Sequence, residues 1–173
     1  STHIGPAGFN PFLGDGEFGW TYVIWMVFTA GLVSCAIWPT AVARALAAEG
    51  ASVAIADKDS GLAVVEDIKN TGGQALDIPT DVSDEDATRD MVAKTIKAFG
   101  KLDILINNAG INSYKSIEEI DLETWNRTIA VTLTGTFICT RLSLPAMQSQ
   151  GSGNIINIAS VAPWLGRGTI DYN

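Results

Sequence analysis

Short apolar runs alternate with longer segments of helical character from position 40 to the end of the chain. The strand-like runs are Ser52–Ala56, Ala75–Pro79, Leu102–Asn108 and Asn154–Ser160. Helices are predicted between them, over residues 40–49, over 62–69, from Ser83 to Phe99 and from Asp121 onward. Strands that are apolar on both faces and separated by helices are typical of a parallel sheet covered on both sides. The pattern therefore predicts an α/β fold with a doubly wound parallel sheet.

Capping and breaking residues set the expected ends of these helices. Gly50 closes the alanine-rich first helix, because glycine readily adopts the left-handed conformation that ends helices. Ser83 followed by Asp86 resembles a capping box, and Asp121 can cap the long helix that follows it. Pro145 is expected to break that long helix, because proline lacks the backbone N–H that a helix interior uses.

The first forty residues differ from the rest of the chain. Residues 1–19 are rich in glycine and proline and are expected to be irregular. Trp20–Ala43 contains no charged residue and is long enough to span a membrane. Within it, Val23–Phe28 has the size and the β-branched and aromatic content of a buried parallel strand. Three interpretations follow: a buried first strand, a membrane span, or a sequence foreign to the fold.

Composition narrows the possible functions. The 173 residues carry 11 Lys and Arg against 19 Asp and Glu, a formal net charge of −8. This balance argues against a protein that binds a nucleic-acid backbone. Cys35 and Cys139 form neither a disulfide framework nor a zinc-binding spacing, and both are expected to be reduced, buried thiols. His3 alone cannot support a catalytic triad or a metal site of several histidines, so no metal is predicted.

Polar residues and glycines stand where the predicted strands end, at the edge where such sheets bind ligands. These strand exits are Asp57, Asp81, Asn107–Gly110 and Ser160. The Asp57 carboxylate can accept hydrogen bonds from both hydroxyls of an adenosine ribose and would repel a 2′-phosphate. Asp81 is explained equally well as an acidic residue in the segment that leads into the next helix. The residue types at these exits predict a cleft for a nucleotide.

Residues at the ends of the last two strand-like runs add detail to that cleft. Side-chain amides after Leu102–Asn108 can tie neighbouring strands together, and the small pair Ala109–Gly110 lets a flat ring approach the backbone. Ser160 and Tyr172 lie twelve positions apart, and two hydroxyls over one carbonyl can polarise and protonate it. Because the reference pKa of tyrosine is about 10, Tyr172 would need a nearby cation to act at neutral pH.

Taken together, several segments resemble the short-chain dehydrogenase/reductase family. They are ALAAEGASVAIAD, DVSDED, LDILINNAG, TLTGTF and GNIINIASVA, followed by a tyrosine, and they extend from about Ala41 to Tyr172. The resemblance implies a Rossmann-type sheet that binds NAD(H) or NADP(H). It also implies hydride transfer between the nicotinamide and a small-molecule alcohol or carbonyl. The expected organisation is an irregular segment over 1–19 and one partial Rossmann domain over 20–173, with an atypical first strand and turn over 20–39.

The resemblance assigns roles to residues of this chain. It implies that Ser160 holds the substrate oxygen and that Tyr172 is the general acid and base. Asp57 would bind the adenosine ribose, which favours NAD over NADP. The remaining cofactor-binding positions that it implies are Asp81 and Val82 beside the adenine, and Asn108, Ala109 and Gly110 along the cofactor. By the same analogy we expect a cytoplasmic homo-oligomer that pairs through its long helices.

Three departures from the family pattern limit these expectations. Thr29–Pro39 carries one glycine where the family has a glycine-rich turn, and Pro39 is expected in the first turn of the following helix. The sequence ends at Asn173, before the family's lysine and later strands. Thr132 stands where the family has an asparagine. We therefore expect a fold incomplete at its C-terminus and weak or no catalysis. The alternatives are a non-catalytic module that binds a nucleotide or a protein, and, least favoured, a membrane anchor through 20–43.

Overall fold

The computed structural model describes residues 23–28, 33–113 and 115–159 of the chain. Their parallel strands form a five-stranded sheet in the order β3-β2-β1-β4-β5. The strands are β1 (Val23–Phe28), β2 (Ser52–Asp57), β3 (Gln74–Pro79), β4 (Ile104–Asn107) and β5 (Asn154–Asn157). The helices are α1 (Val33–Ala48), α2 (Leu62–Asn70), α3 (Glu85–Phe99), α4 (Leu122–Ile129) and α5 (Gly135–Gln150), with the π-helical turn η1 (Ala130–Thr134) between the last two. The predicted doubly wound α/β fold is confirmed.

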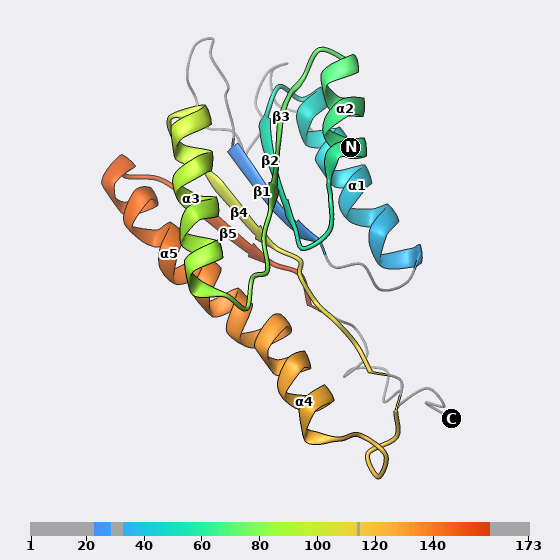
Figure 1. Ribbon diagram of the computed structural model, residues 1–173. Helices are drawn as coiled ribbons and strands as arrows, with labels where there is room; N and C mark the ends of the chain where they lie inside the picture. The colour runs from blue at the N-terminus through green and yellow to red at the C-terminus, as the bar shows by residue number, and fades with distance from the viewer. Residues whose placement is uncertain (1–22, 29–32, 114, 160–173) are drawn as a thin grey trace, which may run out of the picture.

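Three layers make up the described part of the chain (Figure 1). Helices α1 and α2 cover one face of the sheet, and α3 and α5 cover the other. Helix α4 continues in line with α5 and extends past the sheet. Because every strand runs in the same direction, all the strand exits lie along one edge.

The charge-free N-terminal stretch contributes the central strand. Strand β1 pairs with β2, where Val23 lies opposite Ser52, and with β4, where Ile24 lies opposite Ile104. The strand-like run Val23–Phe28 is therefore a strand of the parallel sheet with a neighbour on each side, as the pattern predicted. The membrane-span interpretation of Trp20–Ala43 is wrong, because this stretch supplies strand β1 and the start of helix α1 rather than one continuous helix. Residues 1–19 lie outside the described residues.

Both proline expectations are wrong. Helix α1 begins at Val33, so Pro39 lies within the helix and not in its first turn. Pro145 lies inside α5, which continues to Gln150 without a break. A proline inside a helix removes one hydrogen bond, and the packing of a long helix against the sheet can offset that loss. Helix α5 contacts β4 and α3, which supplies such packing.

Of the two N-terminal helix caps that the sequence predicted, the cap of α4 is confirmed and the cap of α3 is a different residue. The Asp121 side chain accepts a hydrogen bond from the Thr124 N–H at 2.7 Å and caps α4 as expected. The cap of α3 is Asp84 instead of Ser83, because Asp84 Oδ1 accepts from the N–H groups of Asp86 and Ala87. The Ser83 hydroxyl is engaged elsewhere, as described below.

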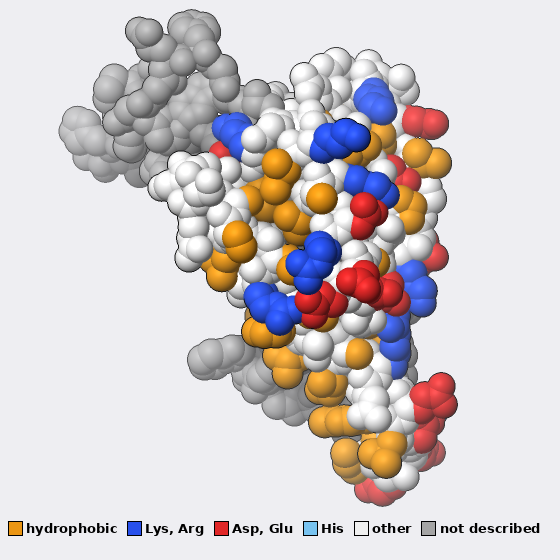
Figure 2. All heavy atoms as spheres, turned by 60° about the vertical axis from the view of Figure 1, so that its left-hand side comes forward, with side chains coloured by type: hydrophobic (Ala, Val, Ile, Leu, Met, Phe, Trp, Pro, Cys, Tyr) orange, Lys and Arg blue, Asp and Glu red, His pale blue; other side chains and the backbone are white. Residues whose placement is uncertain are grey.

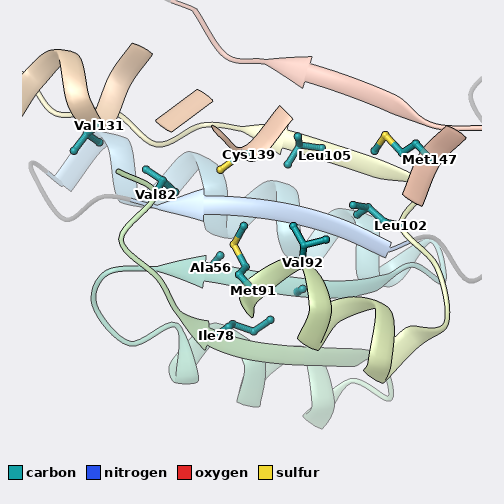
Figure 3. Close-up of a cluster of buried hydrophobic side chains, with 11 residues drawn as sticks. Ala56, Ile78, Val82, Met91, Val92, Leu102, Leu105, Val131, Cys139 and Met147 are labelled. Carbon is teal, nitrogen blue, oxygen red and sulfur yellow. The ribbon is translucent and has the colours of Figure 1, made fainter. Parts of the chain in front are cut away.

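One hydrophobic cluster lies on each face of the sheet. Figure 3 shows the cluster under α3 and α5, in which Met91, Leu105 and Cys139 are buried. The cluster under α1 and α2 is built around Val53, Ile55 and Ile68. Burial raises the pKa of the Cys139 thiol to about 12, which makes it the inert, reduced thiol that the sequence predicted. The side chain of Cys35 lies outside the described residues.

The long helix carries an apolar stripe that the described residues leave exposed. Figure 2 shows hydrophobic side chains on this side of the molecule and over its projecting lower end. The exposed apolar residues of α4, η1 and α5 are Leu122, Trp125, Leu133, Phe137 and Leu144. By length and composition alone, Leu122–Gln150 could cross a membrane. Core helices of soluble proteins meet the same test, so this finding carries little weight.

Candidate functional site

Three of the predicted site segments meet at the carboxyl edge of the sheet. Asp57 is the last residue of β2, Asp81 follows the end of β3, and Asn108 follows β4. Strands β2 and β4 flank β1, so these exits lie on both sides of the central strand. Ser160 and Tyr172 lie outside the described residues, and the catalytic pair stays a prediction.

Asp57 is a buried carboxylate that pairs with no cation among the described residues. It is 9% exposed, and its Oδ1 accepts a hydrogen bond from the Asp59 N–H at 3.0 Å. Burial raises the pKa of Asp57, and the charge of Asp59 adds to that effect, while backbone N–H groups oppose it. Within the described part of the chain, no lysine or arginine forms an ion pair with Asp57. A charge held in this way favours a ligand that can donate hydrogen bonds to it.

Asp81, in contrast to Asp57, accepts hydrogen bonds from side chains, one of which is a cation. Its Oδ1 accepts from the Ser83 N–H at 3.0 Å and from the Ser83 hydroxyl at 2.6 Å. Its Oδ2 lies 2.8 Å from an Arg127 nitrogen and 3.8 Å from Lys58 Nζ. Burial would raise the pKa of Asp81, but the hydrogen bonds from Ser83 and Arg127 outweigh it and lower the pKa to about 2. This carboxylate is ionised and bound within the protein.

Arg127 is a site residue that the sequence did not reveal. From helix α4 it donates to the Ser83 hydroxyl at 2.8 Å as well as to Asp81. It thereby fastens the segment between β3 and α3 to the long helix. A single arginine on the polar side of an amphipathic helix carries no local sign of such a role.

The side chain of Val82 belongs to the hydrophobic core. It is 3% exposed, and a Cβ added to Gly135 would lie 2.7 Å from its Cγ2. The valine side chain therefore packs against the helix backbone, where only a glycine fits. The contact of Asp81 and Val82 with an adenine stays a prediction.

Asn107 ties two strands and a helix together. Its Nδ2 donates to Asn157 Oδ1 at 2.8 Å and to Thr140 Oγ1 at 3.2 Å. The expectation that an amide at this exit links neighbouring strands is confirmed. This link fixes the point from which the chain continues into Asn108, Ala109 and Gly110.

The backbone after β4 is open at Gly110. Asn108 and Ala109 are partly buried, whereas Gly110 is exposed. Among the described residues, a Cβ added to Gly110 would meet only Thr132 Oγ1, at 3.9 Å, which is an ordinary contact distance. A flat group could therefore approach this stretch of backbone closely.

Thr132 supports the loop that follows Gly110. It lies in the π-helical turn η1, and its Oγ1 accepts a hydrogen bond from the Ile111 N–H at 3.4 Å. Such π-helical turns inside longer helices are frequent at functional sites. At the position where the family resemblance implies an amide, this chain places a hydroxyl that is already engaged.

Of two hollows in the described surface, one lies away from these residues and the other reaches Arg127 and Ile111. One, of about 900 Å³, lies at the opposite edge of the sheet between the ends of α1 and α2, where Arg44 and Asp67 form an ion pair. The other, of about 410 Å³, lies beside the first turns of α4 and includes Asn112 and Arg127 in its lining. Apart from Arg127 and Ile111, neither hollow includes the site residues discussed above.

Comparison with known proteins decides the family. The sequence model of the short chain dehydrogenases matches residues 39–169. The chain belongs to the short chain dehydrogenase family. Among curated relatives of this family, it is similar to an uncharacterized oxidoreductase of Thermotoga maritima, with 43% identity over 69% of this chain and 48% of the relative. It is equally similar to the trans-4-hydroxycyclohexanecarboxylate dehydrogenase of Sinomonas cyclohexanicum, with 43% identity over 72% of this chain and 51% of the relative.

Solved structures of short chain dehydrogenases agree with the fold. A 3-ketoacyl-ACP reductase from Sinorhizobium meliloti 1021 superimposes with a TM-score of 0.73 and 34% identity, over 80% of this chain and 54% of that structure. The Rossmann-type sheet that the resemblance implied is therefore shown. The chain spans about half the length of the curated relatives it matches.

Proposed function

We propose that this short-chain dehydrogenase chain binds NAD(H) along the carboxyl edge of its sheet and interconverts a small-molecule alcohol and its carbonyl. The nicotinamide would supply the hydride acceptor or donor. The observation that carries the proposal is Asp57, a buried carboxylate at the exit of β2 whose charge no described cation neutralises. The open backbone at Gly110, on the other side of β1, supports it.

The residues at the two exits fit an adenosine ribose better than a 2′-phosphate. Ribose hydroxyls can donate hydrogen bonds to the Asp57 carboxylate and so stabilise its charged form. A 2′-phosphate would instead meet a negative charge in a poorly solvated place. Lys58 follows Asp57 in the sequence, but its Nζ lies 3.8 Å from Asp81 Oδ2. Its positive charge is therefore partly balanced by Asp81. We therefore expect NAD to be preferred over NADP.

The chemical step is assigned to two hydroxyls. In this proposal Ser160 holds the substrate oxygen, and Tyr172 donates a proton to it during reduction or removes one during oxidation. A Tyr172→Phe substitution should abolish the formation of NADH from an alcohol while leaving the affinity for NAD+ unchanged. NADH absorbance with a panel of secondary alcohols, alongside a binding isotherm, measures both quantities. A measurable turnover of the wild-type chain that Tyr172→Phe leaves unchanged would contradict the assignment.

Nucleotide preference gives the test of the binding site. Calorimetric titration of the chain with NAD+ and with NADP+ should give a dissociation constant at least about tenfold lower for NAD+, the scale of one hydrogen-bonded charge. A tighter complex with NADP+, or no heat with either nucleotide, would show that the site is not the one proposed.

A non-catalytic nucleotide-binding module is the second candidate, and Thr132 favours it. Its hydroxyl accepts a hydrogen bond from the Ile111 N–H and supplies no amide donor, whereas the family resemblance implies an asparagine that helps hold a proton-relay water. This candidate predicts NAD+ binding without NADH formation. A Thr132→Asn variant that gains turnover would favour the enzyme, because it restores the implied amide.

We further propose that the chain pairs with a second copy through its long helix. The exposed apolar side chains Leu133 and Phe137 support this pairing, since monomers rarely expose a continuous apolar stripe. Sedimentation velocity of the wild-type chain should show a dimer or a larger oligomer. Phe137→Glu should shift it towards the monomer, and a wild-type monomer at all concentrations would contradict the proposal.

A further inference from the structure

The chain reverses direction between Asp57 and helix α2, and a residue of β3 holds this reversal in place. Asp77 lies on β3, opposite Ile55 of β2. Its Oδ1 accepts a hydrogen bond from the Gly61 N–H at 2.9 Å, and its Oδ2 accepts from the Ser60 hydroxyl at 3.4 Å. Asp77 therefore fastens the far end of the Lys58–Gly61 loop to the neighbouring strand.

The backbone of the loop lies very close to β2 and β3 at this end. A Cβ added to Gly61 would lie 2.6 Å from Ile55 Cγ2 and 2.8 Å from Asp77 Oδ1. Only a glycine allows the backbone to approach both groups, and this approach brings the Gly61 N–H to the carboxylate. At the near end of the loop, Asp57 accepts the Asp59 N–H. Two carboxylates thus fix the two ends of one short loop.

The charge of Asp77 also acts on Asp57. After burial and the charge of Asp59, the charge of Asp77 contributes to the raised pKa of Asp57. Its field therefore reaches the place where the proposed ribose hydroxyls would bind. A group carrying two additional negative charges would meet the repulsion of both aspartates there.

We propose that Asp77 is a positioning and specificity residue of the ribose site, which holds the Asp57 loop in its binding geometry and adds to the rejection of a 2′-phosphate. This inference rests on the proposed binding of NAD at Asp57. Asp77 has no contact with the ligand in this account: it acts on the loop through Gly61 and Ser60, and on the phosphate through space.

Two substitutions separate these two actions. Asp77→Asn keeps an oxygen that can accept the Gly61 N–H but removes the charge. It should leave the dissociation constant for NAD+ within about threefold of wild type and lower that for NADP+ about three- to tenfold. Asp77→Ala removes both hydrogen bonds and the charge. It should weaken NAD+ binding about tenfold, because the Gly61 N–H loses its partner and the loop loses its anchor.

The experiment is a calorimetric titration of each protein with NAD+ and NADP+, with circular dichroism to confirm the fold. Asp90→Asn is the matched control, because Asp90 is an exposed aspartate on α3 paired with Lys94 at 2.6 Å, away from the loop. This control should leave the ratio of the two dissociation constants unchanged. If Asp77→Ala does not fold, the ratio for Asp77→Asn still decides the specificity role.

The outcomes separate this inference from the proposed function. An unchanged ratio in Asp77→Asn overturns the specificity role, and wild-type affinity of folded Asp77→Ala overturns the positioning role. In both cases the proposed function still holds if the wild-type chain binds NAD+ and the Asp57→Ser variant does not. If the wild-type chain binds neither nucleotide, the proposed function and this inference both fail.

Discussion

Asp57 ends β2 and Asp81 follows the end of the neighbouring β3, and the surroundings of the two carboxylates shift their pKa values in opposite directions. Burial raises the pKa of Asp57, and its described partners are backbone N–H groups. Asp81 binds Ser83 and Arg127, and these hydrogen bonds outweigh burial and lower its pKa to about 2. The difference shows that the role of an aspartate at the end of a strand is set by its hydrogen-bond and ion-pair partners and not by its residue type.

The two arrangements have different consequences for stability. A carboxyl group with a raised pKa is harder to ionise in the folded state than in the unfolded state, so its ionised form destabilises the fold at neutral pH. A ligand that donates hydrogen bonds to the carboxylate can offset this loss. A carboxylate with a lowered pKa adds stability at neutral pH. We therefore assign ligand binding to Asp57 and scaffolding of the β3–α3 segment to Asp81.

The largest expected effect is on binding at Asp57. Asp57→Ser should raise the dissociation constant for NAD+ about 10- to 100-fold, the range for hydrogen bonds to a charged group. The same variant should unfold at the same or a higher urea concentration, because it removes a poorly solvated charge. A loss of stability without a loss of affinity would reverse the roles given to the two aspartates.

The next effect is on stability at Arg127. Arg127→Met leaves Asp81 and Ser83 without their partner on α4 and should lower the free energy of unfolding by about 1–2 kcal/mol. Urea denaturation measures this change. Arg89→Met is the control, because Arg89 forms an exposed pair with Glu85 within one helix and should cost under about 0.5 kcal/mol. Equal losses in the two variants would mean that the Arg127 link carries no special weight.

A smaller effect distinguishes the two aspartates by pH. Because the pKa of Asp81 is lowered, its contribution is complete above the unfolded pKa near 3.8 and is lost as pH falls towards about 2. The difference in unfolding free energy between wild type and Asp81→Asn should be constant above about pH 5, at roughly 1 kcal/mol, and should fall steadily below the unfolded pKa and disappear below about pH 2. Asp57→Asn should show the opposite sign, since the cost of charging Asp57 disappears on acidification. A pH-independent difference for Asp81→Asn would contradict its lowered pKa.

The smallest effect concerns Lys58. It lies 3.8 Å from Asp81 and its side chain is 62% exposed, so Lys58→Met should change the free energy of unfolding by less than about 0.5 kcal/mol. A loss in urea denaturation larger than that of Arg127→Met would make Lys58, rather than Arg127, the main cation of Asp81.

Local patterns predicted most of the fold and part of the site. The apolar run Val23–Phe28 gave the central strand, because a buried parallel strand needs nothing but length and apolar residues. Asn107 was recognised as a strand tie from its place at a strand end. The link between Arg127 and Asp81 joins residues 46 positions apart, and no local pattern records such a contact.

Competing local signals account for the remaining differences. Ser83 and Asp84 are both good helix caps, and the contact of Ser83 with Asp81 leaves Asp84 to cap α3. Asp77 did have a signal, since it is an acid between two apolar residues of a strand, but its partner Gly61 lies in a loop 16 positions away. The strength of a cap or an anchor thus depended on tertiary contacts.

The central claim is that Asp57 is a charge held ready for a hydrogen-bonding ligand while Asp81 is already satisfied. Carbon NMR titration of the aspartate side-chain carboxyls, without and with saturating NAD+, tests it directly. We predict that the pKa of Asp57 lies above its usual range in the free chain and falls on addition of NAD+, while that of Asp81 stays near 2 in both. A pKa of Asp57 that NAD+ does not move, or a shift at Asp81 in its place, would contradict the account.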